Sequence, residues 1–87
     1  MHDHATCFTF PCAYPLKVMG PKTGAFEKAV RDILAKHLQD TPVVYDKRLS
    51  GTGKYLAITA TFEATSKAQL DAIYQELNDH ELVVMTL

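Results

Sequence analysis

The residues best suited to binding a ligand lie in one short segment between two expected elements, Gly20-Pro21-Lys22-Thr23-Gly24. The segment leads into an expected helix, whose unpaired first-turn amides and dipole favour an anion. Its two glycines let a ligand approach the backbone, and Lys22 adds a positive charge. A Walker A loop would need a longer glycine-bounded stretch before its Lys-Thr pair. The segment therefore predicts either a small-molecule site formed by Gly20, Lys22, Thr23 and Gly24, or only a tight turn in which Thr23 caps the helix.

Two cysteines and two histidines near the start of the chain come closest to a metal-ligand set. Cys7 and Cys12 have the spacing C-x4-C, and His2 and His4 precede them. A structural zinc site usually has four ligands at tighter spacings, and the two histidines fall on an expected flexible tail. We therefore expect no metal and no cofactor. In a reducing compartment we also expect the two thiols to stay unpaired.

The remaining titratable residues do not form a catalytic pattern. His37 and His80 stand at or just past the C-termini of expected helices, where an imidazolium complements the helix dipole. The sequence places no Ser, Cys or Thr beside either histidine, so it gives no support for a nucleophile and base pair. The carboxylates Asp71, Glu76 and Asp79 fall on the exposed side of a helix and indicate a solvated face. We predict no catalytic residue and expect a protein that is not an enzyme.

The first half of the chain has the periodicity of a strand followed by a helix. Residues 14–19 alternate, with Leu16 and Val18 on one face. Residues 26–38 carry apolar side chains at helical spacing, and the helix is expected to end near Gln39. Opposite charges four residues apart on its outer face predict three intrahelical pairs: Glu27 with Arg31, Lys28 with Asp32, and Asp32 with Lys36.

The second half has the pattern of a hairpin, a helix and a last strand. Residues 43–49 and 55–62 are expected strands joined by the turn Ser50-Gly51-Thr52-Gly53. Ser66 and Gln69 have the capping-box spacing, which predicts that each satisfies the other's backbone amide at the start of a helix. In residues 82–87 alternation resumes, and we expect a strand in which Val83, Met85 and Leu87 face the core.

This element order, β-α-β-β-α-β, predicts an α+β ferredoxin-like sandwich. Right-handed crossovers place both helices on one face of a four-stranded antiparallel sheet. Residues 10–87 form the expected single domain, and residues 1–9 form an expected flexible tail. With 87 residues, the chain is too short for a second domain.

The opposite face of the predicted sheet is open and unusually apolar. On the expected register it presents Lys17, Met19, Tyr55, Ala57, Thr59, Thr61, Leu82, Val84 and Thr86. A surface of this composition favours self-association or docking of a protein partner, and the predicted partner surface is Lys17, Met19, Tyr55, Ala57, Thr59 and Val84. A shift of one residue in the last strand would exchange its two faces.

Composition and charge weigh against two other classes of partner. Nine basic residues balance ten acidic ones, so the net charge is −1, whereas a small nucleic-acid binder usually carries a basic stripe. An RNA-recognition sheet stacks bases on several aromatic residues, and this open face offers only Tyr55, with Lys47, Arg48 and Lys54 near the hairpin for phosphate. No apolar run approaches the roughly 20 residues that span a bilayer, and the first residues lack the pattern of a signal peptide. We expect no membrane partner, no nucleic acid and a cytoplasmic location.

The stretch Phe10-Pro11-Cys12-Ala13-Tyr14-Pro15-Leu16-Lys17-Val18-Met19-Gly20 resembles a signature of the YbeD-like family, small bacterial proteins of unknown function. The closing run Glu81-Leu82-Val83-Val84-Met85-Thr86-Leu87 is also similar to that family, and the resemblance covers residues 8–87. It implies a ferredoxin-like fold similar in shape to ACT domains. Those domains bind small effectors, often amino acids, near the first strand–helix loop at a dimer interface.

Three hypotheses follow, in order of support. The first is a non-enzymatic regulatory domain that binds a protein partner, or a second copy of itself, through the open sheet face. The second is an ACT-like sensor of an anionic metabolite or amino acid that uses residues 20–24. The third is an RNA-binding accessory protein, which the charge balance disfavours.

Overall fold

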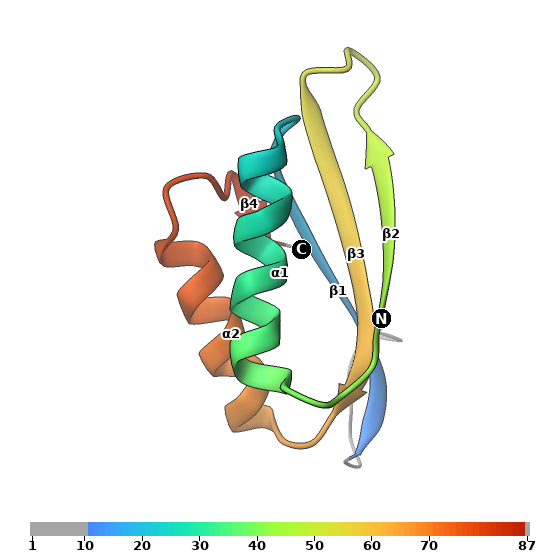
Figure 1. Cartoon of the computed structure of the whole chain (residues 1–87), viewed down its shortest axis with the longest axis vertical. Helices are drawn as coiled ribbons and strands as arrows, with labels where there is room; N and C mark the ends of the chain where they lie inside the picture. Colours follow the sequence, from blue (N-terminus) through green and yellow to red (C-terminus); the bar gives the residue numbers. More distant parts are fainter. Residues whose placement is uncertain (1–10, 87) are drawn as a thin grey trace, which may run out of the picture.

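The computed structural model describes residues 11–86 and has the predicted element order (Figure 1). Its elements are β1 (Cys12–Pro21), α1 (Gly24–Leu38), β2 (Val43–Leu49), β3 (Tyr55–Ala64), α2 (Lys67–Asp79) and β4 (Met85–Thr86). The hairpin strand β2 has its predicted bounds, whereas β1 and β3 are longer than expected. These two strands pair with each other over their full ten residues, so each extends the other beyond its own alternating segment.

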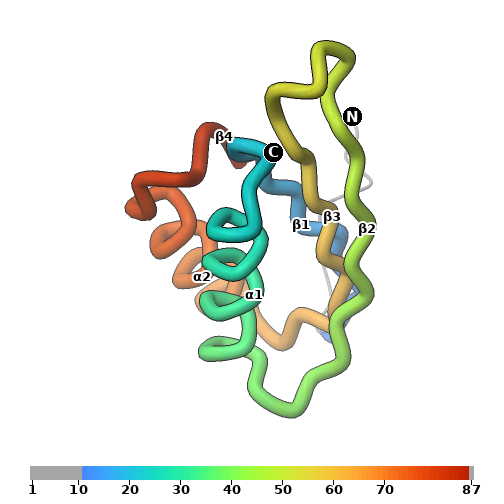
Figure 2. The backbone as a smooth tube through the Cα atoms, turned by 45° about the horizontal axis from the view of Figure 1, so that its top comes forward, coloured from blue at the N-terminus to red at the C-terminus, as the bar shows by residue number. Residues whose placement is uncertain are grey.

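The four strands form one antiparallel sheet in the order β2-β3-β1-β4, so β1 and β3 are central. Helices α1 and α2 lie side by side over one face of this sheet, as the two views show (Figures 1 and 2). The predicted α+β ferredoxin-like sandwich is therefore confirmed. Within residues 11–86, neither helix has the length and apolar character needed to cross a membrane.

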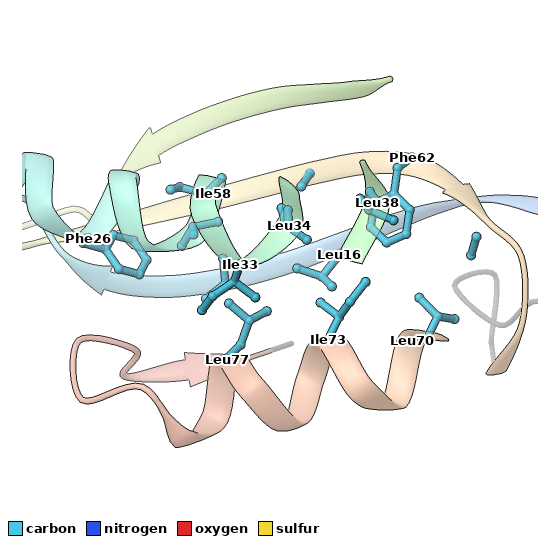
Figure 3. Close-up of a cluster of buried hydrophobic side chains, with 14 of the residues drawn as sticks. Leu16, Phe26, Ile33, Leu34, Leu38, Ile58, Phe62, Leu70, Ile73 and Leu77 are labelled. Carbon is cyan, nitrogen blue, oxygen red and sulfur yellow. The ribbon is translucent and has the colours of Figure 1, made fainter. Parts of the chain in front are cut away.

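The core lies between the two helices and the sheet (Figure 3). Even-numbered residues of β1 and β3, such as Leu16 and Ile58, face the helices. The buried apolar residues are Leu16, Val18, Phe26, Val30, Ile33, Leu34, Leu38, Leu56, Ile58, Ala60, Phe62, Ala64, Leu70, Ile73 and Leu77. Because side chains alternate along a strand, burial of this set leaves the odd-numbered residues of β1 and β3 on the other face.

Both helices begin at a hydroxyl cap. The Thr23 hydroxyl accepts a hydrogen bond from the Phe26 amide at 3.1 Å, and the Ser66 hydroxyl accepts one from the Gln69 amide at 3.0 Å. The predicted reciprocal half of the second cap is wrong by one residue, because Gln69 Oε1 accepts from the Thr65 amide at 2.9 Å. Each hydroxyl satisfies an amide that the first helical turn leaves unpaired.

Two prolines lie in the central strand β1 without disrupting its pairing with β3. The Lys22 amide donates to the Lys54 carbonyl on the β3 side, and the Met19 carbonyl accepts from the Val84 amide on the β4 side. Backbone groups alternate along an antiparallel strand, so odd-numbered residues of β1, including Pro15 and Pro21, point their backbone groups away from β3. Among the described residues β4 pairs only with Val18 and Met19, so neither proline removes a ladder hydrogen bond.

Candidate functional site

The open face of the sheet is built from alternate residues of three long strands. In β1 and β3 these are the odd-numbered residues, which lie in the cross-strand pairs Pro15–Thr61, Lys17–Thr59, Met19–Ala57 and Pro21–Tyr55. The adjacent β2 residues on the same face are Val44, Asp46 and Arg48, opposite Thr61, Thr59 and Ala57. The structure therefore brings together five of the six predicted partner-surface residues, namely Lys17, Met19, Tyr55, Ala57 and Thr59.

Large apolar side chains are exposed at both ends of this face. Tyr55 is 41% exposed and Met85 48% exposed, near Met19 and Ala57 in the register. At the other end Val44 is 69% exposed. Helices cover the opposite face, so these side chains have no neighbouring layer of the described chain over them.

The last strand has the other register from the one predicted. The Val83 amide donates to the His80 carbonyl, and the turn delays the start of β4 until Met85. Met85 pairs with Met19 and therefore shares the open face, while Thr86 pairs with Val18 and faces the helices. The Thr86 hydroxyl accordingly lies 3.1 Å from Asn78 Oδ1 of α2.

Three assignments of the last strand to the open face are corrected by this register. Thr86 is on the helix side, and Leu82 packs against the core. Val84 is 55% exposed but precedes the strand, and its amide binds the Met19 carbonyl. Met85, which was expected to face the core, is the residue of this segment that the open face gains.

The β2 residues of the open face were missed by the sequence. The adjacent valines Val43 and Val44 hide the phase of alternation at the start of the strand. Pairing resolves the phase, because Val43 lies opposite the buried Phe62 and Val44 opposite Thr61. The charged run Asp46-Lys47-Arg48 could have resolved the phase. Because side chains alternate along a strand, Lys47 shares a face with Tyr45, and Asp46 and Arg48 lie on the opposite, open face.

The predicted ligand loop is largely occupied by the protein itself. Gly20 is a buried strand residue, and a Cβ there would collide with the Phe26 ring and lie 2.6 Å from the Leu82 carbonyl oxygen. Its small size thus allows core packing rather than the approach of a ligand. Thr23 caps α1, as the alternative interpretation predicted. Lys22 and Gly24 remain exposed.

Glu76, predicted to be a solvated carboxylate, instead joins the two helices. Its Oε2 lies 2.9 Å from Lys36 Nζ, and its Oε1 lies 2.8 Å from His37 Nε2. Hydrogen bonds from Lys36 and His37 hold the pKa of the Glu76 carboxyl below its usual value. The expected Asp32–Lys36 pair does not form, because Lys36 reaches across to α2.

A second set of contacts joins α1 to β2. Lys47 Nζ lies 3.0 Å from Glu27 Oε1, so the expected Glu27–Arg31 pair is replaced. The Arg31 guanidinium instead lies 4.3 Å from the centre of the Tyr45 ring, a cation–π distance. Partial burial raises the pKa of the Tyr45 hydroxyl, and the Arg31 charge opposes that shift. Of the three predicted intrahelical pairs only Lys28–Asp32 forms, at 2.7 Å.

His80 and the tyrosine pair also serve structural contacts. His80 Nδ1 accepts a hydrogen bond from the Leu82 amide at 3.1 Å, so the ring contacts the turn that follows α2. The Tyr14 and Tyr74 hydroxyls lie 3.0 Å apart. Burial, together with this hydrogen bond, raises the pKa of Tyr74.

The other sequence candidates are dispersed. Lys47 and Arg48 face opposite sides of β2, and Lys54 lies in the hairpin turn, so the three cations share no surface. Cys12 is disulfide-bonded, contrary to the reduced thiol expected from the sequence. Cys7, His2 and His4 lie outside the described residues. Within residues 11–86 no group of three or more potential metal ligands occurs.

Comparison with known proteins bears on the identity of the chain. Residues 5–87 match the model of a family described as "Protein of unknown function (DUF493)". A UPF0250 protein of Nitrosomonas europaea is 39% identical over 79 residues, which cover 90% of this chain and 91% of the relative. A UPF0250 protein of Neisseria gonorrhoeae is 42% identical over 86 residues, covering 98% of this chain and 94% of the relative.

A solved structure supports the fold independently. The solution structure of protein HP0495 from H. pylori superposes with a TM-score of 0.75 and covers 97% of this chain and 89% of that one. The two sequences are 17% identical, so this likeness shows a shared fold alone. The resemblance noted in the sequence is confirmed by the family match, and the chain belongs to the DUF493 or UPF0250 family of small bacterial proteins, which is the YbeD family.

Proposed function

We propose that this protein is a non-enzymatic regulatory domain that acts by binding a protein partner through the open face of its sheet. The observation that carries the proposal is the exposure of Val44, Tyr55 and Met85 on one side of the sheet, opposite the helices. Large apolar side chains that gather on one exposed face of a small protein often mark a surface that binds a partner.

The pattern of residues on this face describes the partner it would accept. Apolar side chains at the two ends flank a polar row formed by Asp46, Thr59 and Lys17. A protein surface with apolar contacts at its margins and one group of each charge near its centre would complement it. A small anion would use only Lys17 and Arg48 and would leave the apolar area uncovered.

The non-enzymatic part of the proposal is supported by the use of reactive side chains in structural contacts. The hydroxyls of Thr23 and Ser66 cap helices. Of the two described histidines, His37 binds Glu76 and His80 accepts from a backbone amide. None of these groups is presented to the open face.

The alternative, an ACT-like sensor of an anionic metabolite or amino acid, has less support. It would depend on Lys22 and Gly24, which are exposed at the start of α1. The Phe26 ring and the Leu82 carbonyl fill the space beside Gly20, and the Thr23 hydroxyl already caps α1.

The proposal is tested by placing a charge on the open face and an identical charge elsewhere. Ala57→Glu puts a carboxylate beside Met19 in the middle of the apolar end. Ala72→Glu makes the same substitution on the exposed side of α2 and serves as the matched control. Both variants should keep the wild-type circular dichroism spectrum, because neither position is buried. Immobilised wild-type protein and each variant are then used to capture partners from the source lysate.

We expect a protein retained by the wild type and by Ala72→Glu to be lost from Ala57→Glu. Thr59→Arg should also lose it, although the charge has the opposite sign, since both variants disrupt the same surface. If every captured protein binds Ala57→Glu and Thr59→Arg as well as the wild type, the open face is not the docking surface. A second copy of this chain as the captured species would identify self-association.

A further inference from the structure

Within residues 11–86, the outer edge of β2 is a row of backbone groups with no strand beside it. This strand is at the margin of the sheet, and Figure 2 shows it running along the side farthest from α2. The Ser50 amide donates to the Tyr55 carbonyl at 2.9 Å, so the even-numbered residues direct their backbone groups toward β3. Alternation therefore turns the amide and carbonyl groups of Tyr45, Lys47 and Leu49 away from the sheet.

The side chains along this edge carry a self-complementary charge pattern. Asp46 and Arg48 lie on the open face, and their own contact is loose, with 4.0 Å between Arg48 Nε and Asp46 Oδ2. On the helix side Leu49 is 55% exposed. The strand contains no proline, so every outward position has both a donor and an acceptor.

We propose that the β2 edge pairs antiparallel with the β2 edge of a second copy of this chain, with Lys47 opposite Lys47 of that copy. The two copies would then share one continuous sheet, with all four helices on the same side. This pairing uses the edge of the sheet rather than its open face, so it stands independently of the proposed function.

The charges on β2 favour this register over those with the two-fold axis at another residue of the strand. A two-fold axis at Lys47 places Asp46 opposite Arg48 twice, in the pairs whose side chains are closest. An axis at Asp46 would place two carboxylates opposite each other, and an axis at Arg48 would do the same with two guanidinium groups. Neither group has a close ion pair to offset the repulsion, whereas Lys47 is paired with Glu27 at 3.0 Å. An axis at Tyr45 would leave Arg48 opposite Pro42, beyond the start of the strand.

The residues on the helix side are compatible with the same register. Each Lys47 is already paired with Glu27 at 3.0 Å. The two lysines near the axis would therefore be accompanied by two carboxylates that balance their charge. Tyr45 would lie opposite Leu49 of the second copy and would cover its exposed side chain. The register therefore gives a partner both to the loosely paired charges and to the exposed leucine.

Reversal of the two charges tests the register directly. The full chain is examined by sedimentation velocity over a wide range of concentration, with circular dichroism as the check of folding. We expect the wild type to dimerise and Asp46→Arg and Arg48→Asp each to weaken the dimer about tenfold, because like charges then face each other across the axis. The double variant D46R/R48D should recover the wild-type constant, since the exchanged charges again face opposite ones.

Lys67→Asp reverses a charge on the exposed surface of α2, on the side of the molecule away from β2 (Figure 2), and is the control. The dimer should tolerate it. A wild-type chain that stays monomeric at the highest concentration would overturn the proposal, as would a double variant that remains as weak as the single ones. Loss of partner capture in Ala57→Glu would leave this result unchanged, so the two proposals fail separately.

Amide hydrogen exchange is a second test, because edge pairing should protect the amides of alternate β2 residues. Tyr45, Lys47 and Leu49 should become protected as concentration rises, because their amides gain acceptors only in the dimer. Val44, Asp46 and Arg48 should be protected at every concentration by β3. Equal behaviour of the two sets would contradict edge pairing.

Discussion

The two glycines of the first strand–helix connection, Gly20 and Gly24, have different surroundings. Gly20 has no side chain because the Phe26 ring and the Leu82 carbonyl fill the space where a Cβ would stand. Gly24, only four residues later, has nothing within 4 Å of such a position. The two glycines look equivalent in the sequence. Only the fold shows that packing requires a glycine at position 20 and leaves room for a side chain at position 24.

This contrast predicts different effects of the same substitution. Gly20→Ala should lower the free energy of unfolding by roughly 1–3 kcal/mol, the usual cost of overpacking a tight core. Gly24→Ala should be neutral or slightly stabilising, because alanine favours the first turn of α1 more than glycine does. Urea unfolding of the two variants measures the difference. Equal stabilities would show that Gly20 is not held by Phe26 and Leu82.

At the scale of elements, charged residues of α1 connect the layers of the fold. Glu27 and Arg31 contact β2, and Lys36 and His37 contact Glu76 of α2. Spacing along a helix identifies pairs that could form within it. It says nothing about partners that tertiary structure brings closer, which is why two of three predicted pairs were replaced.

The bridge at Glu76 predicts a pH dependence of stability. Because folding lowers the pKa of this carboxyl from its ordinary value of 4.5, the folded state binds the proton less tightly than the unfolded state. The bridge therefore contributes stability above pH 4.5 and loses that contribution as pH falls through the folded-state pKa. Glu76→Gln should be less stable than the wild type near neutral pH, and the gap should close in acid.

Thermal unfolding between pH 3 and pH 7 provides this measurement. Glu81→Gln removes the same charge from the exposed turn after α2 and is the control, for which we expect no comparable gap. A gap for Glu76→Gln that persists unchanged at pH 3 would mean that the bridge does not act through the ionised carboxylate.

The elements themselves could be predicted from the sequence because their signals are local. Alternation in residues 55–62, helical spacing in residues 26–38 and the caps at Thr23 and Ser66 all depend on neighbouring residues. The predicted facing of the last strand was wrong because its register is set by a turn at His80 and by the pairing of Met85 with Met19. The contribution of Val44 to the open face also depended on a partner strand. Faces of weakly alternating strands are thus a tertiary property that sequence alone leaves undetermined.

At the scale of the whole molecule, the fold divides the surface of its sheet into two unlike faces. The helices bury one face, and the other displays Val44, Tyr55 and Met85 around the polar row. Within residues 11–86 no buried residue is polar or charged. On the proposal made above, this open face is the surface that binds a protein partner.

The most direct measurement of this claim is methyl NMR of the protein with alanine and methionine methyl groups labelled. The spectrum is recorded before and after addition of the protein captured by Ala72→Glu but not by Ala57→Glu. We predict that the shifts concentrate on Met19, Ala57 and Met85, which lie together on the open face. Shifts that concentrate instead on the exposed helix methyls of Ala35, Ala68 and Ala72 would contradict the account.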